Sequence, residues 1–277
     1  MNIYSSKLSL ITGGSSGIGL SLAKKILQLE GNVVILARRK ELLDKALADL
    51  RNYRKRDNQN IFSIQADVTQ QTDISEKLES FVSLQGLPDF IFNSAGVAHP
   101  GNFTSLKHDI FHWMMDVNYF GTVNVLKTLV PLMQKRRSGS IINISSIAGF
   151  IGVYGYTAYG ASKFAVSGFT DALRAELHPY GISLSIVFPP DTNTPQLEYE
   201  RKYKPFITKE IAGSANLLTS DAVAEEILKQ VARKKYLILP GSEGKLLYFG
   251  KNLLGGTLYP VMDMMVRSAI KKIKFHS

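Results

Sequence analysis

Two residues that could do acid–base chemistry stand four positions apart in the stretch YGYTAYGASK (154–163): Tyr159 and Lys163. On a helix this spacing projects both side chains from one face. A free tyrosine titrates at about 10, and a nearby ammonium favours the phenolate, so the pair could exchange a proton with a carbonyl oxygen. Tyr154 and Tyr156 have no lysine four residues on, and we expect them to line the mouth of the site. A lysine-rich chain produces about one such pair by chance. Whether this pair is functional therefore depends on the elements around it.

A glycine-rich stretch, TGGSSGIG, follows the first predicted strand and opens the first predicted helix. A tight turn needs glycine, a pyrophosphate must approach bare backbone, and the amino end of a helix offers free N–H groups. The spacing G-x-x-x-G-x-G differs from the common G-x-G-x-x-G fingerprint. Gly13, Gly17 and Gly19 are therefore candidate contacts for the phosphates of a dinucleotide.

Two arginines, Arg38 and Arg39, directly follow the second predicted strand. In dinucleotide-binding folds an acidic residue at this strand tip binds a ribose 2′-hydroxyl, whereas an arginine pairs with a 2′-phosphate. The sequence has two guanidinium groups here and no acid, so it predicts NADPH as the cofactor. The alternative is that both arginines only begin a solvated basic helix.

Short apolar runs alternate with helical patterns along the chain. Runs this rich in Ile, Val, Leu and Phe are typical of strands buried on both faces, and a repeated strand–helix alternation predicts a parallel sheet with right-handed crossovers. We expect an α/β fold, a doubly wound Rossmann-type sheet of about seven strands with helices on both faces, as a single domain over 1–277. Residues 189–235 are expected to form a lid region on the substrate side. The predicted strands are 8–12, 32–37, 61–66, 89–93, 140–145, 183–188 and 236–240, and the predicted helices are 17–30, 39–56, 72–85, 104–115, 119–137, 157–179 and 220–234.

Composition excludes several classes of function. The 277 residues include no cysteine, so disulfides, thiolate metal sites and cysteine nucleophiles are excluded. The five histidines are scattered, and no acidic residue completes a metal motif around His108 and His112, so no metal is expected. The net charge of +10 is concentrated in residues 38–56 and 241–277. An anionic cofactor and a lipid surface explain these two segments, and no nucleic-acid recognition module is visible, so nucleic acid is not an expected partner.

In this order, six motifs resemble the short-chain dehydrogenase/reductase family over about residues 7–195: TGGSSGIG, ADV, NSAG, VNYFG, INISSIAG and YGASK. The NSAG motif at the end of the fourth predicted strand has Ser94 where the family's N-N-A-G has asparagine. The resemblance implies further cofactor contacts beyond the glycines and arginines, at Ser15, Ser16, Ile18, Asp67, Val68, Asn93, Ala95, Gly96, Tyr159 and Lys163.

The same resemblance implies a catalytic set of Asn118, Ser146, Tyr159 and Lys163. Tyr159 would donate its proton to a carbonyl oxygen as hydride arrives at the carbon, and Ser146 would hold that oxygen. Lys163 would also hold the nicotinamide ribose, and Asn118 would hold a water that relays protons. A non-enzymatic NADPH-binding sensor would be expected to have lost part of this set, and here all four positions are filled.

After the sixth predicted strand the chain reads PPDTNTPQ, in which Thr192 and Thr194 are candidates for the nicotinamide amide. This double-proline form resembles a lipid-metabolising branch of the family that uses NADPH to reduce the 3-ketone of long-chain sphingoid bases. A long-chain sphingoid ketone is therefore the expected substrate. An enzyme acting on another lipophilic ketone, such as a hydroxysteroid dehydrogenase, would keep every catalytic residue and is the alternative.

The segment 241–277 combines leucine, methionine and aromatic residues with flanking lysines, the composition of an interfacial segment. No apolar run approaches the roughly 18 residues of a spanning helix, and the amino end MNIYSSKLSLITGG enters a strand without the pattern of a secretory signal. We expect a cytoplasmic protein that contacts the cytoplasmic face of a membrane through 241–277; the alternatives for this segment are a lid and a subunit contact. The family resemblance also implies a homo-oligomer, a dimer or tetramer.

Overall fold

A seven-stranded parallel sheet forms the centre of the protein in a computed structural model that describes residues 2–212 and 217–276. The strand order is β3-β2-β1-β4-β5-β6-β9, and all neighbouring strands are parallel. The chain winds outward in both directions from β1 and β4, which places a topological switch point between them. This confirms the predicted doubly wound fold class. The strands are β1 (Leu8–Thr12), β2 (Asn32–Ala37), β3 (Ile61–Gln65), β4 (Phe90–Asn93), β5 (Gly139–Ile144), β6 (Ile182–Val187) and β9 (Leu237–Ile238).

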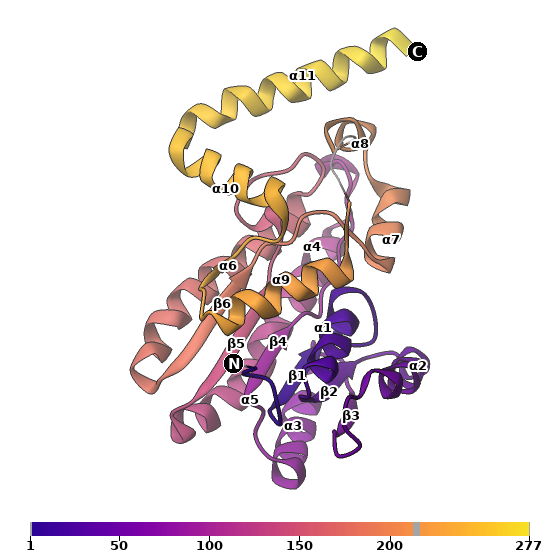
Figure 1. The fold of residues 1–277 in the computed structure, drawn as a ribbon. Coiled ribbons are helices and arrows are strands. Elements are labelled where there is room, and N and C mark those ends of the chain that lie inside the picture. Colours follow the sequence, from indigo (N-terminus) through magenta and orange to yellow (C-terminus); the bar gives the residue numbers. More distant parts are fainter. Residues whose placement is uncertain (1, 213–216, 277) are drawn as a thin grey trace.

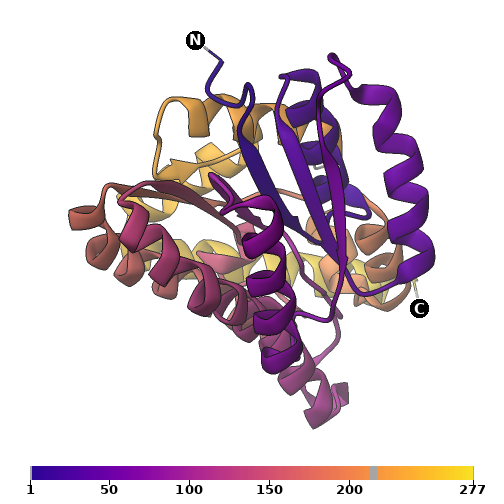
Figure 2. The same ribbon diagram turned by 90° about the horizontal axis from the view of Figure 1, so that it is seen from below.

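Helices cover both faces of the sheet, as Figure 2 shows. On one face, α1 (Gly17–Gln28), α2 (Lys40–Leu50) and α9 (Ser220–Ala232) bury apolar side chains against the strands in one core cluster. On the other face, α3 (Gln71–Gln85), α5 (Gly121–Arg136) and α6 (Thr157–Leu177) form a second cluster. Because both faces are covered, most residues of the central strands are buried, and in β4 all four are.

One long helical segment replaces the two separate helices expected over 104–115 and 119–137. Helix α4 (His108–Met114) continues through a π-helical turn (Met115–Phe120) directly into α5. This segment packs closely against the loop that follows β3. A Cβ at position 121 would lie 2.6 Å from Val68 Cγ2, which explains why Gly121 stands there. The π turn buries Asn118, which is consistent with the frequent occurrence of such turns at functional sites.

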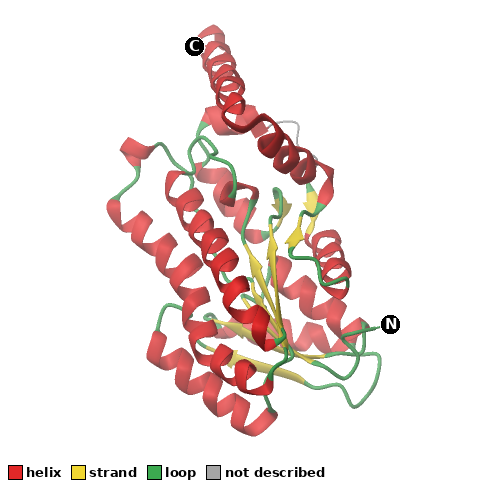
Figure 3. Ribbon diagram, turned by 90° about the vertical axis from the view of Figure 1, so that its left-hand side faces the viewer, coloured by secondary structure: helices red, strands yellow, loops and turns green. Residues whose placement is uncertain are grey.

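Beyond β6 the chain forms a group of smaller elements at one end of the sheet. They are β7 (Thr192–Asn193), α7 (Pro195–Tyr203), α8 (Phe206–Ala212), β8 (Leu218–Thr219), α10 (Gly241–Leu254) and α11 (Leu258–His276). Figures 1 and 3 show α10 and α11 stacked beyond this end, with α11 extending across α8. Among the described residues, none of the helices combines the length and hydropathy needed to span a bilayer. Short 3₁₀ turns lie at Arg51–Tyr53, Phe103–Ser105, Ile147–Gly149, His178–Tyr180 and Gly255–Thr257.

Candidate active site

A cavity of about 980 Å³ lies at the carboxyl ends of the strands. Its walls come from the turn after β1, the tips of β2, β4, β5 and β6, and the elements α7, α10 and α11. This is the edge at which doubly wound sheets bind ligands, and the size is at the upper end of the roughly 300–1,000 Å³ of typical ligand pockets. The cavity therefore has room for a large ligand or for two ligands together.

The glycine-rich turn forms one end of this cavity, and its backbone conformation explains the glycines. Gly13 and Gly17 have φ of 66° and 53°. A Cβ on Gly13 would lie 2.8 Å from the Ser94 carbonyl, and one on Gly19 would lie 2.5 Å from the Gly13 carbonyl. Ser16 at the N-cap of α1 makes no side-chain capping bond within the described chain, so the first N–H groups of α1 remain available. This bare backbone and the positive end of α1 fit the diphosphate of a dinucleotide.

The tips of β2 and β3 bring two predicted cofactor contacts together. Arg38 Nη1 lies 3.2 Å from Asp67 Oδ2, although the arginine side chain is largely exposed. Asp67 Oδ1 also accepts hydrogen bonds from Thr69, from its N–H at 3.0 Å and its hydroxyl at 2.9 Å. Burial raises the pKa of Asp67, but these hydrogen bonds and the guanidinium outweigh burial, so the pKa falls below its ordinary value. Arg39 lines the cavity beside this pair.

The proposed proton donor lies on α6, on the cavity wall. Burial raises the pKa of Tyr159, and the nearby Glu200 carboxylate raises it further, whereas hydrogen bonding to Ser146 and Gln196 acts in the opposite direction. The net direction is upward in the free protein. The lowering expected from the lysine together with an oxidised nicotinamide stays a prediction for the cofactor-bound state; in the free protein burial is the largest influence and favours the protonated phenol. A protonated phenol is the form required of an acid.

Lys163 lies behind the phenol. Its Nζ is 5.8 Å from the centre of the Tyr159 ring and donates a hydrogen bond to the carbonyl of Ile144, at 3.0 Å. Burial lowers the pKa of Lys163 to about 8, although Glu200 opposes this shift. In the free protein this shift brings the pKa of Lys163 closer to neutrality.

The two serines after β5 point in different directions. Ser145 is buried, and its hydroxyl donates to the Lys163 carbonyl at 3.0 Å. Ser146 is partly exposed, its Oγ accepts from Ala148 N–H at 3.2 Å, and it reaches the Tyr159 hydroxyl. Ser146, the residue chosen by its spacing from Tyr159, is thus the one beside the phenol.

Two predicted site residues lie behind the cavity wall. Asn118 is 1% exposed; its Oδ1 accepts from Val97 N–H at 2.8 Å, and its Nδ2 donates to the Val97 carbonyl at 3.0 Å and Ser162 Oγ at 2.8 Å. It therefore fixes the loop after β4. Asn93, predicted as a cofactor contact, is also buried, and its Nδ2 donates to Asn143 Oδ1 at 2.8 Å. This prediction is corrected: side chains alternate along β4, and the residues after Asn93 line the cavity instead.

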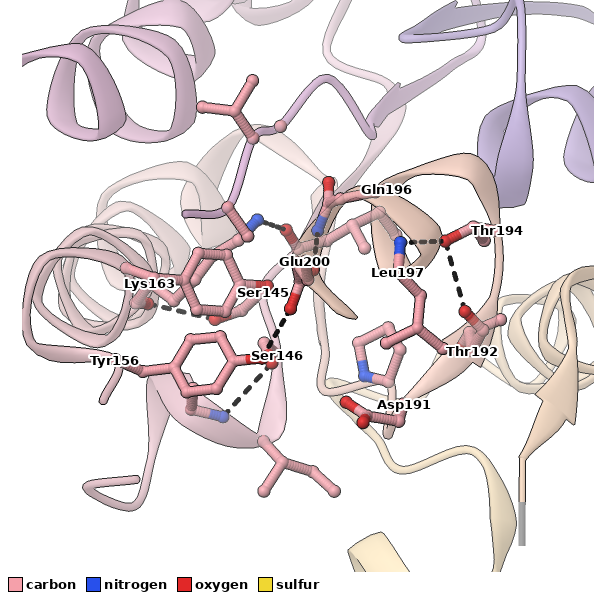
Figure 4. A pocket seen from close by; sticks show the side chains of 18 of the residues that line it. Ser145, Ser146, Tyr156, Lys163, Asp191, Thr192, Thr194, Gln196, Leu197 and Glu200 are labelled. Atoms are coloured by element: carbon pink, nitrogen blue, oxygen red, sulfur yellow. Dashed lines mark hydrogen bonds between the residues drawn. The ribbon is translucent and has the colours of Figure 1, made fainter. Parts of the chain in front are cut away.

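The remaining predicted contacts all line the cavity. Thr192 Oγ1 donates to the Pro190 carbonyl at 2.8 Å, and Thr194 Oγ1 donates to the Thr192 carbonyl at 3.2 Å (Figure 4). Thr194 Oγ1 also accepts from Leu197 N–H at 3.3 Å and so caps α7. Both hydroxyls thus shape the turn after β6. The others are Gly13, Ser15, Ser16, Gly17, Ile18, Gly19, Arg38, Arg39, Asp67, Val68, Ala95, Gly96, Tyr159 and Lys163.

A cluster of polar side chains that the sequence did not predict faces Tyr159 from α7. The Tyr156 hydroxyl donates to Glu200 Oε2 at 2.6 Å, and Gln196 Nε2 donates to Glu200 Oε1 at 3.0 Å (Figure 4). Tyr156 is 7% exposed, so it is a wall residue and not, as expected, a residue of the mouth. The four-residue spacing of Gln196 and Glu200 places both side chains on one face of a helix and could have indicated this cluster. It did not lead to a prediction, because a glutamate on a short charged helix is usually exposed.

Comparison with known proteins shows the family and the fold of this chain. The family model for short chain dehydrogenases matches residues 7–204. The 3-ketodihydrosphingosine reductase of Mus musculus is 33% identical over 86% of this chain and 72% of its own. The 3-dehydrosphinganine reductase of Danio rerio is 34% identical over the same shares. Among solved structures, a short-chain dehydrogenase from Sphingobium yanoikuyae in complex with NADPH has a TM-score of 0.76 at 24% identity, covering 93% of this chain and 95% of that one.

Proposed function

The chain belongs to the short chain dehydrogenase family and is an oxidoreductase, and on that premise we propose that it reduces the 3-ketone of 3-ketodihydrosphingosine with NADPH. The observation that carries the proposal is the meeting of Ser146, Tyr159 and Lys163 at one wall of a cavity whose wall at α10 and α11 is largely apolar. The names of the curated relatives support this substrate. The product would be dihydrosphingosine.

In this mechanism the chain's own residues position the ketone and move a proton. Ser146 donates a hydrogen bond to the ketone oxygen and fixes it beside the Tyr159 hydroxyl. A bound nicotinamide dinucleotide supplies the hydride for the carbonyl carbon. Tyr159 gives its proton to the oxygen, and the Lys163 ammonium stabilises the phenolate that remains. Asn118 acts indirectly: its hydrogen bonds to Val97 hold in place the loop that ends at the cavity.

The cofactor chemistry fits the residues present. The glycine turn and the amino end of α1 suit a diphosphate, and the paired guanidinium groups of Arg38 and Arg39 suit a 2′-phosphate. We therefore propose NADPH over NADH. Arg38→Ala should raise the KM for NADPH by about tenfold or more while leaving the KM for NADH unchanged, because only NADPH carries a 2′-phosphate that can pair with the arginine. Equal effects on both cofactors would contradict this assignment.

The function is tested by NADPH oxidation in the presence of 3-ketodihydrosphingosine. Tyr159→Phe removes only the phenolic hydroxyl and should lower kcat roughly a hundredfold to ten-thousandfold. Tyr154→Phe is the matched control: Tyr154 lines the same cavity but is 37% exposed. If the wild type leaves the sphingoid ketone unchanged but reduces a steroid ketone, the substrate assignment fails and the family assignment stands.

We also propose that the outer surface of α10 and α11 contacts the cytoplasmic face of a bilayer. Residues 241–277 hold six basic and two acidic side chains. On the other side of these helices, Leu247 and Met262 line the cavity. Val261 and Met265 line the cavity and are 43% and 45% exposed, so its mouth opens beside the apolar surface and gives a lipid a short path inward. The outward apolar side chains are Leu246, Phe249, Leu253, Leu254, Tyr259 and Met264.

Sedimentation with phosphatidylserine-containing vesicles tests this contact. Leu246→Glu should weaken vesicle binding by about tenfold or more, because it puts a charge into the apolar surface and adds repulsion from anionic lipid. Leu84→Glu on α3 is the matched control, since Leu84 and Leu246 are each 75% exposed. Equal binding by both variants would show that this surface does not contact lipid.

For the oligomeric state, we propose a homo-oligomer that packs through the helices on the α5–α6 side. Phe120 and Phe164 lie on this side and are 48% and 43% exposed, so they offer apolar surface for contact with a second copy of the chain. Light scattering on the purified protein should give a dimer or tetramer, and Phe164→Asp should shift it toward the monomer. A wild-type protein that is monomeric would refute the proposal.

A further inference from the structure

The side chain of Glu200 is an unusual feature of the cavity wall, because it is a carboxylate that is only 6% exposed. Its two hydrogen-bond donors, the Tyr156 hydroxyl and the Gln196 amide, are both neutral. Among the described residues it forms no ion pair with a basic side chain; the nearby Lys204 is paired with Asp191, at 2.7 Å. A buried charge without a cationic partner is costly, and a ligand cation would remove that cost.

This carboxylate lies next to the proposed reaction centre. The rings of Tyr156 and Tyr159 are 5.6 Å apart, and Gln196, which donates a hydrogen bond to Glu200, is close enough to the Tyr159 hydroxyl to lower its pKa. A ketone whose oxygen docks at Tyr159 and Ser146 therefore places its adjacent carbons near Glu200. Figure 4 shows Glu200 between Tyr156 and Gln196, on the side of the cavity where Ser146 lies.

We propose that Glu200 is the binding site for the substrate's ammonium group, on the carbon adjacent to the ketone. The inference rests on the proposed function, because a sphingoid ketone carries an amino group at that position and a steroid ketone does not. The neutral Tyr156 and Gln196 donors hold the carboxylate oxygens in place and leave its charge for the ligand. The site thus selects amino ketones from other lipophilic ketones.

The same placement sets the direction of the alkyl chain. Leu247 of α10 and Leu258, Met262 and Val266 of α11 form an apolar part of the cavity wall. With the ammonium held at Glu200, the chain extends along these side chains toward the mouth beside α11. The polar head and the apolar tail therefore each meet a wall of matching chemistry.

Steady-state kinetics on two ketones test the proposal. The first is 3-ketodihydrosphingosine, and the second is the 1-hydroxy-3-ketone of the same chain length without the amino group. The wild type should prefer the amino ketone by about 10- to 100-fold in kcat/KM, the range expected of a charge-assisted hydrogen bond. Glu200→Gln should remove this preference, so that its kcat/KM values for the two ketones agree within about twofold. Glu198→Gln, an exposed glutamate on the same helix, should leave the preference intact.

The outcomes separate this inference from the proposed function. A wild type that reduces neither ketone refutes the proposed function. A wild type that reduces both ketones equally well refutes the ammonium site alone, and this comparison does not depend on whether the variant folds. If Glu200→Gln lowers kcat/KM for both ketones by the same factor, Glu200 only holds α7 against α6 through Tyr156, and the inference is wrong.

Discussion

Replacing Lys163 by methionine should stabilise the free protein near neutral pH while it abolishes turnover. Methionine fills a similar volume and carries no charge, so the substitution isolates the cost of burying an ammonium. Lys163 is 5% exposed. The prediction concerns the free energy of unfolding without cofactor, where no ligand charge compensates the lysine.

The size of the effect follows from two opposing contributions. Burial lowers the pKa of Lys163 from its ordinary 10.5 to about 8. At about 1.4 kcal/mol for each pKa unit, keeping the ammonium buried costs about 3 kcal/mol near pH 7. The substitution also removes the hydrogen bond to the Ile144 carbonyl, which contributes about 1 kcal/mol. The variant should therefore be about 2 kcal/mol more stable than the wild type.

The pH dependence gives the sharper test. The folded-state pKa lies below the unfolded-state value, so below about pH 8 both states of the wild type hold the proton and the full penalty applies. Between about pH 8 and 10.5 the unfolded state binds more protons, and wild-type stability rises relative to the variant. The advantage of Lys163→Met should fall from about 2 kcal/mol near pH 7 to about zero between pH 9.5 and 10.

Urea unfolding followed by circular dichroism over this pH range measures both quantities. Lys135→Met on α5 is the control, since this lysine is exposed, and its effect should stay within about 0.5 kcal/mol at every pH. A variant that is less stable than the wild type near pH 7, or a stability difference that does not change with pH, would refute the reasoning.

Two further predictions concern the site's packing and the core. In Gly96→Ala, the new Cβ would lie 3.2 Å from Asn118 Oδ1 and 3.4 Å from Lys163 Nζ, so the asparagine must shift beside the lysine and turnover should fall by about tenfold in steady-state assays. Gly168→Ala on α6, where a Cβ would have nothing within 4 Å among the described residues, should keep full turnover, and equal losses would contradict the steric account. Tyr4→Phe removes the hydroxyl that donates to the buried Leu228 carbonyl at 2.8 Å, and should lower the free energy of unfolding by about 1–2 kcal/mol in urea titrations. No change would mean that water replaces the lost donor.

Much of the fold could be predicted from the sequence because its signals are local. The predicted bounds of β1 and β2 match the observed ones, since a strand buried on both faces is mostly apolar along its length. The two helices expected around Asn118 merged instead, because a π turn leaves no mark in the periodicity of a short segment. The strand expected over 236–240 is shorter in the structure, Leu237–Ile238. It is an edge strand, which pairs with a single neighbouring strand.

The sequence by itself determined which residue types are available for chemistry: a tyrosine and a lysine one helical turn apart, a serine at a set distance before them, and a glycine turn after a strand. Only the tertiary structure decided their environment. It buried Asn93 and Asn118 behind the wall, raised the pKa of Tyr159, and brought Glu200 from a later helix into a hydrogen bond with Tyr156, beside Tyr159. Burial and charge pairing depend on contacts between segments far apart in the chain, and no local pattern encodes them.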